Sequence, residues 1–181
     1  MVNYMKVDIV KVGYLKENCY ILQKDKSVLI IDPGVDADKI KEMIGNRKVV
    51  GILITHNHFD HVGALKEISE YYNVSFYNHD NLSEGIHSIE KFKFEVIYTP
   101  GHSADSVTYY FFDDKKMFVG DFIFRNDIGR CDLPTGDENE MLDSIIRIKK
   151  YENCSVYPGH GDVTTLDYER QNNQYFKIER V

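Results

Sequence analysis

One short segment concentrates side chains that bind metals. Residues 56 to 61 read His-x-His-x-Asp-His, a pattern that a shuffled chain of this composition yields roughly once in a thousand chains. Imidazole and carboxylate groups suit zinc, manganese or iron. Residues two apart in an extended loop point the same way, so His56 and His58 can share one ion. Asp60 and His61, at the turn into a helix, can point to a second ion, and Asp60 would lie near the positive helix end.

Three further polar segments each follow an apolar strand: residues 99–103, 120–121 and 158–161. Ligand sites of α/β proteins collect outside the carboxyl ends of strands, so we expect these segments to converge on the first. They contribute His102, Asp121 and His160, each directly after a glycine that lets the backbone turn tightly. Together the four segments predict a two-metal centre of five histidines and two aspartates.

A lone histidine after a strand is more often a hydrogen-bonded structural residue than a ligand. Five of the seven histidines in the chain nevertheless fall in these segments, which favours ligation for the set. His79 and His87 do not, and we expect them at the surface. Asp32, which ends a strand before Pro-Gly, is expected to form a turn, with orientation of the histidine loop as the alternative.

Strands and helices that could position these segments follow from hydrophobic periodicity. Strands are predicted over residues 6–11, 19–23, 28–31, 49–54, 74–77, 92–98, 106–112, 116–119 and 155–157. Helices are predicted over residues 37–44, 61–72, 138–150 and 166–176. The opening run of strands without helices argues against a simple doubly wound sheet and indicates an α/β layered domain over residues 1–181.

Composition limits the remaining classes of function. The chain is 43% hydrophobic and 28% charged, which is typical of a globular protein, and its formal charge of -7 gives no basic footprint for nucleic acid. No apolar stretch approaches the roughly 20 residues of a membrane span, and the N-terminus does not resemble a signal peptide, so we expect a cytoplasmic protein. The three cysteines, Cys19, Cys131 and Cys154, are expected to be buried or incidental thiols. The sequence indicates no oligomeric state.

These motifs resemble the metallo-β-lactamase superfamily. Asp32-Pro33-Gly34, the 56–61 segment and the pairs Gly101-His102, Gly120-Asp121 and Gly159-His160 occur in that family's order and approximate spacing. The resemblance implies a four-layered αββα sandwich with a dinuclear site at one edge of its sheets. It also implies that His56, His58 and His102 hold one metal, that Asp60, His61 and His160 hold the other, and that Asp121 bridges them.

Residues 120–136 and 168–173 resemble, more narrowly, the small glyoxalase II-like hydrolases of bacteria and archaea. Asp121 stands where one lactamase class has cysteine, and His58 stands where the flavodiiron branch has glutamate. Full-length glyoxalase II adds a C-terminal helical domain that helps bind glutathione, and we expect this chain not to have it. The resemblance therefore implies hydrolysis of a small-molecule thioester, such as S-lactoylglutathione, more strongly than it implies glutathione recognition.

Two adjacent divalent ions, with zinc favoured over iron or manganese, suggest a mechanism. They would lower the pKa of a bridging water to about 7, so that hydroxide is present to attack the carbonyl. Asp60 and Asp121 would be catalytic, with Asp60 orienting the hydroxide. Arg130 and Arg125 would bind a substrate carboxylate, or else be exposed or structurally paired.

Two alternatives use the same residues. His56, His102 and Asp121 also form a two-histidine, one-carboxylate triad, which would suit a mononuclear iron persulfide dioxygenase. A lactonase or β-lactamase-type hydrolase would use the dinuclear site. A binding or structural domain predicts a broken ligand set, and none of the seven residues is missing.

Overall fold

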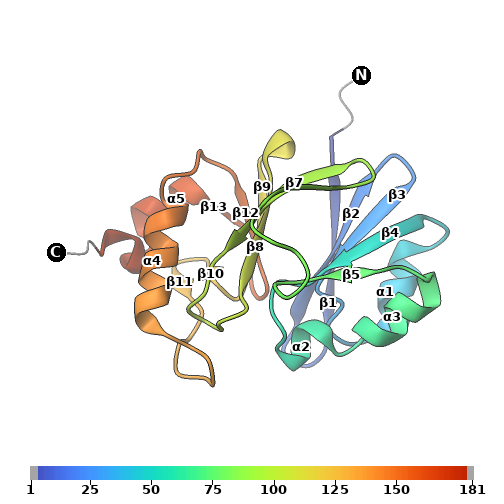
Figure 1. Ribbon diagram of the computed structural model, residues 1–181, viewed down its shortest axis with the longest axis horizontal. Helices are drawn as coiled ribbons and strands as arrows, with labels where there is room; N and C mark the ends of the chain where they lie inside the picture. The colour runs from blue at the N-terminus through green and yellow to red at the C-terminus, as the bar shows by residue number, and fades with distance from the viewer. Residues whose placement is uncertain (1–3, 179–181) are drawn as a thin grey trace.

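Figure 1 shows the computed structural model, which describes residues 4–178, as two facing sheets with helices outside each. The strands of the first sheet are β1 Lys6–Val12, β2 Glu17–Lys24, β3 Ser27–Ile31, β4 Lys48–Leu53 and β5 Phe76–Tyr77. Those of the second are β6 Gly85–Ile89, β7 Phe92–Tyr98, β8 Val107–Phe111, β9 Lys116–Gly120, β12 Ser155–Pro158 and β13 Thr164–Thr165. A separate hairpin pairs β10 Ile123–Phe124 with β11 Asp127–Ile128.

The helices divide between the two outer faces. They are α1 Ala37–Ile44, α2 Phe59–Val62, α3 Leu65–Tyr72, α4 Glu138–Ile148 and α5 Leu166–Asn172, with short 3-10 helices η1 Phe112–Asp114 and η2 Gln174–Lys177. In Figure 1, α1 and α3 lie outside the first sheet, and α4 and α5 lie outside the second. This arrangement is the predicted four-layered αββα sandwich.

Three buried apolar clusters fill the three interfaces between layers. Ile21 and Ile30 of the first sheet pack with Ile40 of α1 and Ile68 of α3. The opposite face of that sheet meets the second sheet through aromatic side chains such as Phe94. A third cluster joins the second sheet to α4 and α5; it includes Tyr110, Met117, Val119, Met141, Ile145, Ile148, Val156 and Leu166. Alternating side chains thus make both faces of each sheet apolar, so each sheet is covered on both sides.

Strand direction places the chemistry-bearing loops at one edge. In the second sheet, β8 is antiparallel to both β7 and β9, and β12 is parallel to β9. The strands β7, β9 and β12 therefore run the same way, and their carboxyl ends lie at the same edge of the sheet. In the first sheet, β4 is parallel to β3 and β5.

One predicted helix is wrong as a continuous element. Residues 61–72 form the end of α2 and all of α3, and the helix is interrupted at Gly63 and Ala64. Ala64 N donates to the carbonyl of Pro33 (3.1 Å), and a Cβ on Gly63 would lie 2.5 Å from Gly34 O. The turn at residues 32–34 thus packs closely against Gly63 and Ala64 and interrupts the helix. Such a contact between distant residues leaves no periodic pattern in the sequence.

The predicted helix over residues 166–176 is also interrupted. It ends at Asn172, and Asn173 then begins η2, with its side chain accepting a hydrogen bond from Tyr175 N. The strands β6, β10, β11 and β13 were not expected from the sequence. Three of these four have two residues each, too few to show an alternating pattern. Across residues 4–178 no helix has both the length and the apolar character needed to cross a bilayer.

All three cysteines are free thiols, as expected. Cys19 and Cys154 are buried, and burial raises the pKa of Cys154 to about 12. Cys131 is half-buried. Since the thiolate is the reactive form, we expect a thiol reagent at pH 8 to label native protein only at Cys131. Mass spectrometry of labelled peptides would check this, with protein unfolded in guanidinium, where all three thiols react, as the control; rapid labelling of Cys19 in native protein would contradict it.

Candidate metal centre

The seven predicted ligands come from four loops that meet at one edge of the sandwich. His56 and His58 follow β4, while Asp60 and His61 lie in α2. The other three, His102, Asp121 and His160, follow β7, β9 and β12 of the second sheet. The loops are joined directly, since Val107 N donates to Thr55 O (2.8 Å) and Gly159 N donates to Gly120 O (2.8 Å).

The ligands form two groups. Potential ligand atoms of His56, His58 and His102 all lie within 4.8 Å of one another, and so do those of Asp60, His61 and His160. These are the same two groups that the sequence resemblance implies. In the second group, Asp60 Oδ2 lies 3.1 Å from His160 Nε2, and this hydrogen bond lowers the pKa of Asp60 to about 2.

Asp121 lies between the two groups. Its Oδ1 is 3.3 Å from His61 Nε2, and its Oδ2 is 3.7 Å from His102 Nε2 and 3.6 Å from His160 Nε2. One carboxylate oxygen thus faces the second group and the other lies near both. This is the placement that a carboxylate needs to contact two ions at once.

Four of the five histidines are each held by a hydrogen bond at Nδ1, which leaves Nε2 as the nitrogen that could bind a metal. His61 Nδ1 lies 2.9 Å from Asp32 Oδ2, and His102 Nδ1 lies 2.8 Å from the carbonyl of Arg130. His160 Nδ1 lies 3.2 Å from the carbonyl of Leu15, and His56 Nδ1 lies 3.0 Å from the Thr55 hydroxyl. Because these oxygens accept, each Nδ1 carries a proton; Nε2 of His56 and His61 makes no hydrogen bond, whereas Nε2 of His160 donates to Asp60 (3.1 Å).

Buried polar atoms without partners indicate that the cluster fits metal ions. His56 Nε2, His61 Nε2 and Asp121 Oδ1 are buried and make no hydrogen bond. His58 Nδ1 and His102 Nε2 lie 3.0 Å apart. Burial lowers the pKa of His56 well below its usual range, so the ring is neutral and its lone pair is available. Buried groups normally have a partner, and a cation coordinated by these lone pairs would supply one.

Asp32 orients the second ligand group through a hydrogen bond to His61. It is buried, its Oδ1 accepts from Thr55 N (2.7 Å), and its Oδ2 accepts from the Thr55 hydroxyl (2.6 Å) as well as from His61. Asp32 also forms the expected turn, with a positive φ of 50° and its carbonyl accepting from Gly34 N. Both roles considered for this residue are therefore present together.

Gly159 is required by close packing at the centre. A Cβ at this position would lie 2.6 Å from His61 Cε1 and closer still to Asp121 Oδ1. We expect Gly159→Ala to displace one of these side chains and to lower the metal affinity of the cluster by about 10- to 100-fold. Competition with dipicolinate followed by metal analysis would check this. Gly51→Ala in β4 is the control, because its added Cβ meets only ordinary contacts at 3.5 Å; equal metal affinity of the two variants would contradict the prediction.

The two predicted substrate-binding arginines lie in different places. Arg130 lines a groove of about 550 Å³ over the cluster, together with Leu15, Phe124, Ile128 and Leu133. Its guanidinium is paired with Asp132 through two contacts of 2.6 Å. Arg125 lines a neighbouring hollow beside His160, and its guanidinium stacks over the Tyr168 ring at 4.9 Å. His79 and His87 lie outside the cluster and are partly buried rather than fully exposed.

Sequence reasoning missed several residues that shape the site. Glu169 is fully buried and accepts from Asn126 N (2.9 Å), and Asn173 Nδ2 donates to the carbonyl of Asp127 (2.9 Å). These two residues hold the β10–β11 hairpin that forms one wall of the groove. The buried Glu17 lies 3.9 Å from His61 Nδ1, and burial raises its pKa well above its usual range. Glu17 stands between the polar residues Lys16 and Asn18, outside the predicted strand 19–23, so no local signal marked it in the sequence.

Comparison with known proteins agrees with the fold and the site. A family model described as the metallo-beta-lactamase superfamily matches residues 12–87 and 83–160. A probable metallo-hydrolase of Bacillus subtilis, YqgX, is 34% identical over 94% of this chain and 97% of its own. The hydroxyacylglutathione hydrolase GloC of Haemophilus influenzae is 28% identical over 94% of this chain and 98% of its own. This chain belongs to the metallo-β-lactamase superfamily, a family of metal-binding enzymes.

Solved structures give the same result. The crystal structure of the B3 metallo-beta-lactamase BLEG-1 superimposes with a TM-score of 0.90 at 30% identity, covering 94% of this chain and 99% of that one. The structure of TTHA1623 in a di-iron-bound form has a TM-score of 0.86 at 30% identity, covering 93% and 99%. The predicted fold and the predicted family are both confirmed.

Proposed function

We propose that this chain is a dinuclear metal-dependent hydrolase that cleaves a small-molecule thioester, such as S-lactoylglutathione. The observation that carries the proposal is the position of Asp121, whose two carboxylate oxygens face two complete ligand groups. In this assignment His56, His58 and His102 hold one ion, and Asp60, His61 and His160 hold the other. Similarity to a hydroxyacylglutathione hydrolase over nearly the whole chain supports the choice of thioester.

Asp60 and Asp121 would have separate roles in this reaction. When bound, the two ions supply an activated water as the nucleophile and polarise the substrate carbonyl. Asp121 and Asp60 would place negative charge beside the ions, and Asp60 would accept a hydrogen bond from the attacking water. A thiolate leaves without needing much protonation, so this reaction does not require a dedicated general acid.

The groove itself would hold the part of the substrate that does not react. Leu15, Phe124, Ile128 and Leu133 supply apolar walls that exclude water from the carbonyl. Arg130 is the one arginine or lysine among the lining residues. Its pair with Asp132 is highly exposed, with 64% and 68% of the two side chains accessible, so a substrate carboxylate can displace Asp132 at little cost.

Metal analysis combined with a substrate panel tests the proposal. Protein purified without chelator is expected to contain two divalent ions, zinc foremost, and to hydrolyse S-lactoylglutathione or simpler thioesters. The panel includes a lactone and a β-lactam, because one structural relative is named a metallo-beta-lactamase. Absence of thioester turnover by metal-replete protein would exclude the proposal.

A mononuclear iron persulfide dioxygenase is the alternative from a different class of enzyme. His102 Nε2 and Asp121 Oδ2 lie 3.7 Å apart beside His56, so the triad that it needs is present. Near-stoichiometric single iron together with persulfide-dependent oxygen uptake would establish this alternative. Two zinc ions without oxygen uptake would exclude it.

A further inference from the structure

His58 differs from the other four histidines of the cluster in how its ring is held. The others each donate Nδ1–H to an oxygen of the protein. For His58, the one side-chain hydrogen-bond contact among the described residues is the 3.0 Å approach to His102 Nε2. The ring is also only half-buried. Its position must therefore come from the backbone that carries it.

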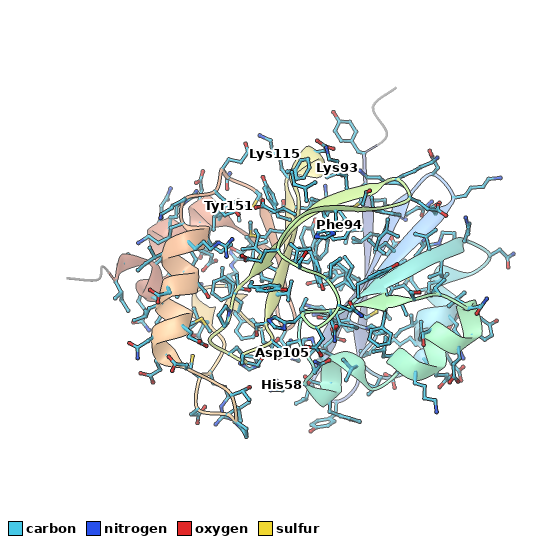
Figure 2. The ribbon with its side chains drawn as sticks, in the orientation of Figure 1. His58, Lys93, Phe94, Asp105, Lys115 and Tyr151 are labelled. Carbon is cyan, nitrogen blue, oxygen red and sulfur yellow. The ribbon has the colours of Figure 1, made fainter. Side chains whose placement is uncertain are left out.

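That backbone is held by Asp105, which lies in the loop between β7 and β8. Asp105 Oδ2 accepts from the backbone N of Asn57 (3.0 Å) and from Asn57 Nδ2 (2.7 Å). Its Oδ1 accepts from the hydroxyl of Ser103 (2.7 Å), the residue after His102. Figure 2 labels Asp105 and His58 at the same edge of the molecule. One carboxylate thus joins the residue between His56 and His58 to the residue that follows His102.

We propose that Asp105 is a positioning residue that fixes His58 against His102 and so sets the metal affinity of the first ligand group. This inference rests on the ligand roles in the proposed function. The carboxylate accepts three hydrogen bonds, and bonds to an ionised acceptor are stronger than neutral ones. Without these hydrogen bonds the 55–61 loop could move relative to the 101–105 loop. His58 and His102 would then no longer be positioned to bind the same metal ion.

The second ligand group provides an internal comparison. The hydrogen bonds of Asp105 go to Asn57 and Ser103 and not to Asp60, His61 or His160, and His61 is oriented by Asp32 instead. Loss of Asp105 should therefore weaken metal binding by the first ligand group and leave metal binding by the second unchanged. A general loss of folding would weaken both.

Replacement of Asp105 tests the proposal through metal binding rather than activity. Asp105→Ala is expected to lower the zinc affinity of one site by about 10- to 100-fold, the range found when partners of metal ligands are removed. Affinity is measured by competition with dipicolinate and metal analysis, and cobalt substitution shows by its visible spectrum whether the geometry changes. Circular dichroism of the metal-free proteins reports on folding.

Two further variants separate geometry from other effects. In Asp105→Asn, the amide oxygen can still accept both Asn57 bonds, and the amide N–H can donate to Ser103, whose hydroxyl turns toward Ser106 (2.8 Å). Its affinity is expected to lie close to that of the wild type. Asn57→Ala removes only the 2.7 Å side-chain bond and keeps the backbone bond, so its loss of affinity should be intermediate.

The outcomes are decisive in each case. The positioning role of Asp105 is overturned if both Asp105→Ala and Asn57→Ala bind zinc as tightly as the wild type. It is also overturned if Asp105→Asn binds zinc as weakly as Asp105→Ala. If Asp105→Ala does not fold, unchanged affinity in Asn57→Ala alone overturns it. Because metal affinity is measured without substrate, absence of thioester turnover would contradict the proposed function and leave this inference standing.

Discussion

Replacing Asp121 with alanine is expected to lower kcat/KM for thioester hydrolysis by at least about 10³-fold. The substitution removes the two oxygens that face both ligand groups, and the loss exceeds the 10²- to 10³-fold typical of one transition-state contact. It also leaves His61 Nε2 buried beside one anion fewer. Metal content measured on the same sample is expected to fall, which links the loss of activity to the centre.

A matched control uses another aspartate. Asp38 lies in the first turn of α1, with a fully accessible side chain whose one ion pair within residues 4–178 is with Lys41. Asp38→Ala should keep wild-type kinetics and metal content. Full metal content and a tenth or more of the activity in Asp121→Ala would mean that this carboxylate does not link the two ions.

Removal of the metals is expected to lower the melting temperature by roughly 8–16 °C. A ligand present at a thousand times its Kd stabilises the folded state by about 4 kcal/mol. Each kcal/mol corresponds to roughly 2–4 °C for a chain of this size. Candidate ligand atoms of His58 and His102 lie 3.0 Å apart, and three buried polar atoms of the cluster make no hydrogen bond, so bound cations would stabilise this arrangement. Scanning calorimetry before and after dialysis against dipicolinate measures the shift.

Re-addition of metal distinguishes specific binding from damage during dialysis. Zinc should restore both the melting temperature and the activity. Magnesium should restore neither, because it prefers oxygen ligands and five of the seven candidate ligands are imidazoles. An unchanged melting temperature after complete metal removal would show that the centre contributes nothing to stability.

Sequence alone located the candidate ligands, because local signals mark them. Each of the four segments follows an apolar run, and the β-branched stretch that became β4 ends just before Thr55. Side-chain type and spacing within the 56–61 segment placed His56 with His58, and Asp60 with His61. Resemblance to a known family supplied the layered fold, which the structure shows, and the remaining ligand assignments, which stay predictions although the structure brings the residues of each assigned group within 4.8 Å of one another.

Other features depend on residues far apart in the chain. Packing of the 32–34 turn against Gly63 breaks a helix whose periodicity is unbroken, and Asp132 already occupies the guanidinium of Arg130. Asp105 reaches Asn57 across 48 positions in the sequence.

Residue types and spacing determined which side chains could bind metals, since ligand chemistry and strand ends are local properties. Tertiary structure alone decided where those side chains are held and by which neighbours, because sheet pairing and loop contacts set those distances and leave no local pattern.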